Sequence, residues 1–138
     1  MATSGYSGTP LERKLGFEPG MTGVFLDAPD GLGLELEGVT VKRALRGRAD
    51  IVLCFVTARR DLERRAARLR TAIAPDGMVW VCWPKKASKV PTDMTEDVVR
   101  DVLLPTGLVD IKVAAVDETW SGLKLVVRKE LRSPQSRG

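Results

Sequence analysis

The stretch ADIVLCFVTARRDLERRAARLRTAIAPDGMVWVCW, residues 49–83, decides the fold class. It begins with ADIVLCFV at 49–56 and ends with MVWVCW at 78–83, two continuous apolar runs of strand length. Such runs are typical of strands that are covered on both faces of a sheet. A strand, a helix and a second buried strand predict a right-handed crossover between parallel strands. Residues 57–74 predict that helix, because one apolar stripe recurs at helical spacing: Leu62, Ala66, Leu69 and Ile73.

Further strands extend this unit in both directions. MTGVFLDA at 21–28 predicts a strand before it, and VTVKRAL at 39–45 predicts a short, partly polar strand near a sheet edge. LVDIKVAAVD at 108–117 and LKLVVRKEL at 123–131 are joined by the short loop ETWSG, which predicts an antiparallel hairpin. We therefore expect an α/β protein with a three-layer, Rossmann-like sheet of about six strands, mostly parallel and ending in that hairpin.

The connections carry shorter signals. DGLGLELEG at 30–38 predicts at most a short helix, and APDG at 74–77 predicts a turn. Asp93 with Glu96 predicts a capping box that opens a helix reaching about Leu104.

The length of 138 residues suits a single domain. Within it we expect an N-terminal clasp at 1–20, a Rossmann-like domain at 21–131 and a disordered tail at 132–138. The clasp carries a short helix that starts with Thr9 as N-cap and Pro10 at its first position. No run of 18 apolar residues and no apolar leader occurs, so we expect a cytoplasmic protein.

The residue types limit the chemistry. The chain has no histidine, the commonest general base near neutral pH and the commonest metal ligand. Cys54 and Cys82 each lie inside a buried strand and lack the spacing of metal ligands, so we expect buried, reduced thiols and no metal site.

Open α/β sheets bind ligands outside the carboxyl ends of their strands, where the strand order reverses. That rule selects the loops that follow the predicted strands, including FLDAPDGLG at 25–33 and WPKKASK at 83–89. The candidate ligand-binding residues are Asp27, Gly31, Gly33, Thr57, Lys85, Lys86, Glu118, Trp120 and Ser121.

The order of elements resembles a shortened class I S-adenosylmethionine-dependent methyltransferase. FLDAPDGLG lines up with the first motif of that superfamily, and IAPDGMVWVCW is similar to the turn that leads into its fifth strand. The resemblance implies that Asp27 and Gly31 to Gly33 lie at the cofactor, and that Glu118 or Asp117 lies near the methyl acceptor.

The chain departs from the methyltransferase pattern at three points. Pro29, which has no N–H, stands where the first glycine of the loop belongs. Lys42 and Arg43 stand where an acid at the end of the next strand would hold the ribose. Only about 22 residues separate Asp27 from Ala49, too few for the usual strand and two helices. We therefore expect no cofactor, and S-adenosylmethionine in its usual pose is disfavoured.

Three longer segments resemble the signature segments of a small actinobacterial family of unknown function. They are GYSGTPLERKLG at 5–16, WPKKASKVPTDMTEDVVRD at 83–101 and VDETWSGLKLVVRKELR at 116–132. This resemblance implies a Rossmann-like fold and no established activity.

Each candidate segment also has a purely structural interpretation. Lys85 and Lys86 could hold a phosphate or a carboxylate, or belong to a solvated loop. Trp120 could stack on a ligand ring, or fold back over the sheet and cap the core. Residues 4–9 could bind an anion at a helix start, or serve only as part of the clasp.

Three functional hypotheses follow. The main one is a non-catalytic or regulatory domain that binds a small anionic ligand at the carboxyl ends of the strands. The alternatives are a divergent S-adenosylmethionine-dependent methyltransferase and a protein interaction module that uses the basic helix 59–73 for a partner or a homodimer. That helix carries six arginines between Arg59 and Arg70, but aromatic residues are only 5% of the chain and none interrupts it. Base stacking, and hence a nucleic-acid partner, is not expected.

Overall fold

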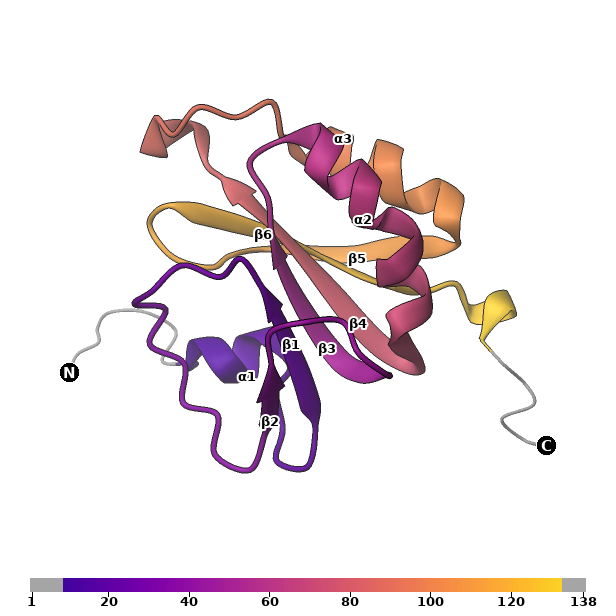
Figure 1. Cartoon of the computed structure of the whole chain (residues 1–138). Helices are drawn as coiled ribbons and strands as arrows, with labels where there is room; N and C mark the ends of the chain where they lie inside the picture. Colours follow the sequence, from indigo (N-terminus) through magenta and orange to yellow (C-terminus); the bar gives the residue numbers. More distant parts are fainter. Residues whose placement is uncertain (1–8, 133–138) are drawn as a thin grey trace.

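The structure, a computed structural model, describes residues 9–132 and contains one six-stranded sheet with helices on both faces (Figure 1). The strands are β1 (Thr22–Leu26), β2 (Thr40–Lys42), β3 (Ala49–Phe55), β4 (Ile73–Pro84), β5 (Leu108–Ala115) and β6 (Trp120–Val127). The α-helices are α1 (Leu11–Leu15), α2 (Arg59–Ala72) and α3 (Glu96–Leu103), and the short 3-10 helices are η1 (Lys86–Ser88), η2 (Leu104–Thr106) and η3 (Lys129–Leu131).

The sheet order is β2-β1-β3-β4-β6-β5, and the first four of these strands are parallel. β6 pairs antiparallel with β4 and with β5, which confirms the mostly parallel sheet that ends in a hairpin. The short β2 lies at one edge, as its polar sequence predicted. In the sheet, β1 has β2 on one side and β3 on the other, so the strand order reverses beside β1. The carboxyl ends of β1 and β3 therefore frame the position where open α/β sheets bind ligands.

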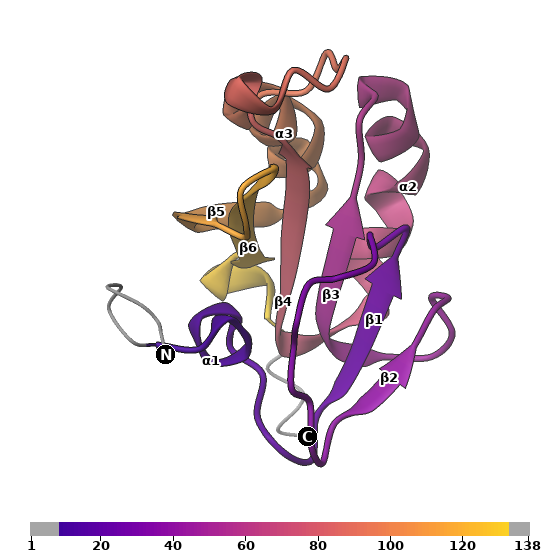
Figure 2. The same ribbon diagram turned by 90° about the vertical axis from the view of Figure 1, so that its left-hand side faces the viewer.

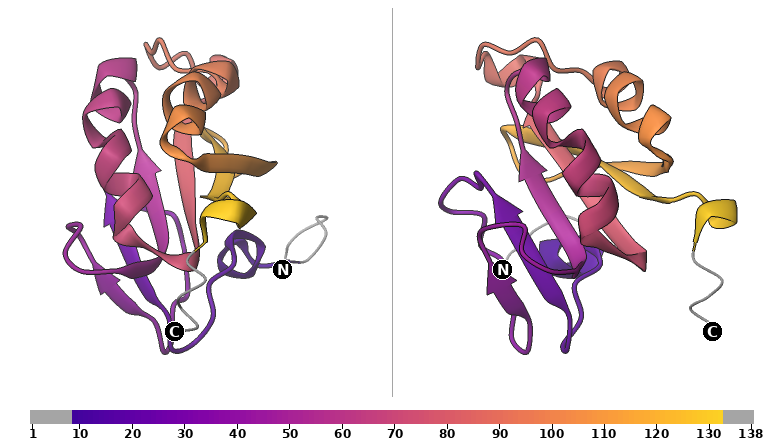
Figure 3. Two further views of the ribbon diagram at one scale, coloured as in Figure 1. Left: turned by 90° about the vertical axis from the view of Figure 1, so that its right-hand side faces the viewer. Right: turned by 45° about the vertical axis from the view of Figure 1, so that its right-hand side comes forward.

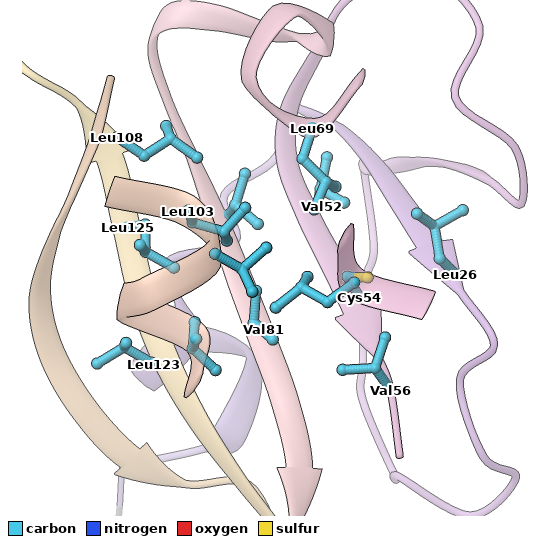
Figure 4. Packing of buried hydrophobic residues seen from close by; sticks show 14 of the residues in the cluster. Leu26, Val52, Cys54, Val56, Leu69, Val81, Leu103, Leu108, Leu123 and Leu125 are labelled. Carbon is cyan, nitrogen blue, oxygen red and sulfur yellow. The ribbon is translucent and has the colours of Figure 1, made fainter. Parts of the chain in front are cut away.

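α2 and α3 cover one face of the sheet (Figure 3). Leu62 and Leu69 of α2 and Leu103 of α3 are fully buried against that face. Figure 4 shows Leu69 beside Val52, and Leu103 near Leu108 and Leu125. Leu62, Ala66 and Leu69 of the predicted stripe face this core, which confirms the buried side of α2. The helix ends earlier than predicted, because Ile73 already begins β4.

The opposite face is covered by α1 and by the coil 27–39 (Figure 2). The indole Nε1 of Trp80 in β4 donates a buried hydrogen bond of 2.8 Å to the carbonyl oxygen of Leu15. Phe17 stacks on Phe25 of β1 with ring centroids 5.8 Å apart. α1 is therefore fixed to the centre of the sheet. The predicted contacts of residues 4–9 and the tail 132–138 lie outside the described residues, apart from Thr9 and Arg132.

The short helix predicted at 30–38 is absent, and this segment of the described chain is an extended coil. Leu32, Leu34 and Leu36 alternate along it and pack on the α1 side of the sheet. An apolar period of two suits extended backbone, so the alternation outweighed the cap signal at Asp30. Gly31 has φ 82 and Gly33 has φ 70, values that end any helix begun there.

Two predicted helix starts are displaced. α1 begins at Leu11 with Pro10 as N-cap, so Thr9 is not the cap. α3 begins after Thr95, whose hydroxyl accepts a hydrogen bond of 3.1 Å from the Val98 N–H. Asp93 instead accepts a bond of 2.7 Å from the backbone N–H of Arg59 at the start of α2. The capping box at Asp93 was wrong because its carboxylate is used by a different helix.

The turn predicted at 74–77 lies within β4 and interrupts its pairing. Ile73 pairs with Ala49 and Met78 pairs with Ile51, so β4 carries extra residues at this point. A Cβ on Gly77 would lie 2.9 Å from the carbonyl oxygen of Asp50, and only glycine fits this close approach. The predicted ETWSG loop is also shorter, because β6 already begins at Trp120.

None of the helices in residues 9–132 has the length and apolar character that a bilayer crossing requires.

Candidate functional site

The loops after β1 and β2 enclose a pocket of about 420 Å³, here called the loop pocket. Most of its lining residues are apolar, about half of the exposed wall is polar, and the pocket opens beside the carboxyl end of β1. The lining residues are Phe25, Ala28, Pro29, Asp30, Gly31, Leu32, Leu34, Leu36, Val41 and Arg43. A pocket of this size and character suits a small organic ligand.

Asp27, the acid that the methyltransferase resemblance placed at a cofactor, does not line this pocket. Its backbone is left-handed with φ 57, and its carboxylate accepts a bond of 2.8 Å from the Arg65 guanidinium of α2. Arg65 also lies 3.5 Å from the Cys54 sulfur. The Asp27 carboxylate is therefore directed toward the α2 side of the sheet.

Asp30 and Arg43 are the two charged residues of the loop pocket. They form no ion pair with each other or with any other residue of the described chain. An acid and a base that line one pocket without pairing can both contact a ligand that carries both charges. Gly31 lies between Asp30 and Leu32 in the same lining, and a Cβ added to it would meet no atom within 4 Å.

A second pocket of about 640 Å³, here called the hairpin pocket, lies between α1 and the turn from β5 to β6. Its lining residues are Thr9, Leu11, Lys14, Lys85, Ala115, Val116, Asp117 and Glu118. The Lys85 N–H donates a 2.8 Å bond to the Thr119 carbonyl, which fixes the end of β4 to this turn. Asp117 Oδ1 accepts bonds of 2.8 Å from the N–H groups of both Thr119 and Trp120. Asp117 thus shapes the turn, whereas Glu118 forms no hydrogen bond or ion pair through its side chain within residues 9–132.

The other predicted site residues serve the fold. The Thr57 carbonyl accepts a 2.6 Å bond from the Thr92 hydroxyl, which ties the loop after β4 to the start of α2. The ring of Trp120 packs edge to face on Phe55, with ring centroids 5.1 Å apart. Trp120 therefore covers the core, the second of the two interpretations that the sequence allowed. Ser121 is paired with Trp83 inside the sheet, and Lys86 opens η1 as an exposed residue.

The predicted site residues therefore do not form one cluster. Gly31 lies at the loop pocket, Lys85 and Glu118 lie at the hairpin pocket, and the remaining ones line neither. Three charged residues that line these pockets were not among the predicted site residues: Asp30, Arg43 and Lys14. Asp30 and Arg43 carried a signal in the sequence, because they are the charges beside the glycine loop and after the next strand. Lys14 carried none, because only the packing of α1 brings it to the hairpin turn.

The two thiols are inert. Burial raises the pKa of Cys54 above its ordinary value, and burial raises that of Cys82 further. Both side chains are buried and form no disulfide, which confirms the prediction from the sequence. Within residues 9–132 there is no group of three side chains with the donor types and proximity that a metal ion needs.

Comparison with known proteins bears on the fold. No protein-family model and no curated protein sequence matches the chain, so the resemblance to the small actinobacterial family stays a prediction. Among solved structures, the chain is similar to a TehB-like SAM-dependent methyltransferase from Corynebacterium glutamicum, with a TM-score of 0.58 and 11% identity over 86% of this chain and 88% of that one. It is also similar to the ribosomal protein L11 methylase of Lactobacillus delbrueckii subsp. bulgaricus, with a TM-score of 0.57 and 12% identity over 86% and 74% of the two chains.

A third similar structure is an S-adenosylmethionine-dependent methyltransferase from Clostridium acetobutylicum, with a TM-score of 0.54 and 8% identity over 78% of this chain and 84% of that one. None of these three structures is more than 12% identical to the chain. At such low identity they establish architecture alone. The domain has a methyltransferase-like Rossmann fold with an antiparallel strand pair at its end.

Proposed function

We propose that this chain is a divergent S-adenosylmethionine-dependent methyltransferase that binds its cofactor in the loop pocket. The observation that carries the proposal is the pair of unpaired, opposite charges, Asp30 and Arg43, among mostly apolar lining residues of a pocket beside the carboxyl end of β1. The likeness of the fold to methyltransferases supports the same position, because ligands of open α/β sheets bind where the strand order reverses.

The residues of the loop pocket fit this cofactor in a changed pose. Its adenine would rest on the apolar wall of Phe25, Leu34 and Val41. Its methionine part carries an ammonium, a sulfonium and a carboxylate, which an acid and an arginine complement together. In the usual methyltransferase pattern the acid after the first strand contacts the cofactor. In this chain that acid, Asp27, is paired with Arg65 instead. When bound, the cofactor supplies an electrophilic methyl group.

The hairpin pocket would hold the methyl acceptor. Its polar lining combines Lys14 and Lys85 with Asp117 and Glu118. Asp117 is already an acceptor for two backbone N–H groups, so it positions the turn. Glu118 has a free carboxylate within the described residues and is the one that would contact an acceptor hydroxyl or amine.

Calorimetry with S-adenosylmethionine and S-adenosylhomocysteine tests the proposal. We expect a micromolar dissociation constant for at least one of them. Asp30→Asn and Arg43→Gln should each weaken binding about fivefold, since an exposed charge contributes about 1 kcal/mol. Arg46→Gln, an exposed arginine outside the pocket lining, is the matched control and should bind like the parent chain. No heat with either ligand at millimolar concentration refutes the proposal.

A second candidate function is the non-catalytic binding of a small anion at the hairpin pocket. It is favoured by Lys14 and Lys85, which line the pocket from two different elements. In thermal shift measurements with inorganic phosphate, the double variant Lys85→Ala and Lys86→Ala should lose the stabilisation that the parent chain shows. Lys89→Ala in the same loop is the control. An unchanged shift in the double variant rules this candidate out.

A further inference from the structure

The outer face of α2, the end of β2 and the connection from β2 to β3 together carry a set of exposed basic side chains, here called the basic surface. Its members are Lys42, Arg46, Arg48, Arg60, Arg64 and Arg68. Helix α2 supplies half of them, and the sequence singled out only this helix. The end of β2 supplies Lys42, and the connection supplies Arg46 and Arg48.

The fold places these two segments side by side. The guanidinium of Arg68 donates a hydrogen bond to the carbonyl oxygen of Leu45, in the middle of the connection. Figure 3 shows the connection from β2 to β3 passing the end of α2. Val41 lines the loop pocket on the α1 side, so the next residue, Lys42, faces the α2 side of the edge strand.

Most of the acidic residues around α2 pair with arginines that lie outside the basic surface. Arg59 is paired with Glu63 and Asp101, and Arg65 is paired with Asp27. Within the basic surface only Arg64 has an acidic neighbour: Asp61 lies 3.6 Å away, with the Arg64 side chain largely exposed and the Asp61 side chain about half exposed.

Lys42, Arg46, Arg48 and Arg60 form no ion pair within the described chain, and Arg68 contacts only a carbonyl. Arg60, Arg64 and Arg68 recur every fourth residue, a spacing at which like charges destabilise a helix. The basic surface therefore carries a charge that folding alone does not require.

The chemistry of its surroundings selects the partner. Interfaces between proteins have an apolar centre. Of the large apolar side chains that are exposed in residues 9–132, two border the basic surface. Val41 faces the loop pocket, and Leu131 lines a small pocket together with Arg48 at the edge of the surface, so neither forms an apolar centre among the cations. No aromatic residue lies in α2 or in the connection, so stacking on single-stranded bases is also unsupported. Cations without an apolar centre or aromatic neighbours suit the phosphates of a duplex, where charge alone gives affinity.

We propose that the basic surface binds double-stranded nucleic acid through its phosphates, without reading the base sequence. Arg60 to Arg68 span about 12 Å along α2, at 1.5 Å per residue. Each strand of a duplex presents a phosphate about every 3.4 Å of its axis, so the helix alone reaches about three of them. The low aromatic content led us to expect no nucleic-acid partner. That argument excludes base stacking only, because contacts to phosphates require cations and no aromatic side chains.

Fluorescence anisotropy with a labelled 20-base-pair DNA duplex tests this inference on the full chain, without S-adenosylmethionine. With about four phosphates contacted, binding should weaken roughly 100-fold between 50 and 200 mM salt. Arg60→Gln with Arg64→Gln should lower the slope of log affinity against log salt by about two. The matched control, Arg13→Gln with Lys129→Gln, removes the same charge from exposed residues of α1 and η3 and should keep the slope.

Three results would overturn the inference: no binding at 50 mM salt, an equal loss of slope in both double variants, or tighter binding to polyglutamate than to the duplex. An equal loss means diffuse attraction by a basic chain, and a preference for polyglutamate means an acidic protein partner. Circular dichroism checks that each variant is folded. Because duplex binding is measured without cofactor, this proposal and the proposed methyltransferase function can fail separately.

Discussion

The hydrogen bond between Trp80 and Leu15 anchors α1, and the variant Trp80→Phe tests its contribution to stability. Both residues are fully buried, and the bond is 2.8 Å long. Phenylalanine keeps a ring in the core but cannot donate, so the carbonyl oxygen of Leu15 loses its partner in a fully buried site. An orphaned buried acceptor costs about 1–3 kcal/mol, in addition to the loss from the smaller ring.

Trp83→Phe is the matched control for the ring atoms. Trp83 is 7% exposed on the other face of the same strand, and its indole N–H forms no hydrogen bond within the described chain. The difference between the two variants therefore isolates the bond to Leu15. With a urea m-value of about 1–3 kcal/mol per molar, Trp80→Phe should unfold at roughly 1 M less urea than Trp83→Phe, measured by circular dichroism. Coincident midpoints would show that α1 is not held by this bond.

Three further changes test the fold and its pH dependence. Deleting residues 1–16 should abolish cooperative unfolding, because it uncovers Trp80; a folded deletion variant that has lost only ligand binding would make the segment part of the site. Thr95→Ala should cost about 1 kcal/mol by removing the cap of α3, and Thr95→Ser should restore the urea midpoint, whereas an unchanged midpoint in the alanine variant would contradict the cap. Burial raises the pKa of Cys54 and Cys82 above 9.0, so the unfolded chain releases these protons first and stability should fall as pH rises above about 9. The double alanine variant should flatten that fall in melting temperature relative to the parent, and parallel curves would argue against the thiols.

The sequence predicted the central sheet well because its signals there are local. The apolar runs at 49–56 and 78–83 and the stripe of α2 each identify one element without reference to the rest of the chain. The antiparallel hairpin followed for the same reason.

The errors arose where the partner of a residue lies far along the chain. Asp93 caps α2 from 34 residues away, which no local cap pattern reveals. The segment 30–38 is extended because its leucines pack on the sheet, and the cap signal at Asp30 could not show that. The prediction of the candidate site failed for a similar reason. The two pockets form where α1 and the coil 27–39 pack on the sheet, and the sequence pattern does not reveal that packing.

The acid that lines the loop pocket is Asp30, three residues after Asp27, the acid that the methyltransferase motif marks. Phe25 faces the α1 side and Leu26 the α2 side, so an extended residue 27 would face the loop pocket. The left-handed backbone of Asp27 directs its carboxylate to Arg65 instead, and Asp30 lines the pocket. Asp27→Asn should therefore leave binding of S-adenosylhomocysteine within twofold of the parent in calorimetry, while Asp30→Asn weakens it about fivefold. If Asp27→Asn weakened binding and Asp30→Asn did not, Asp27 would leave Arg65 when the ligand binds. The acid of the motif would then contact the cofactor, as in other methyltransferases.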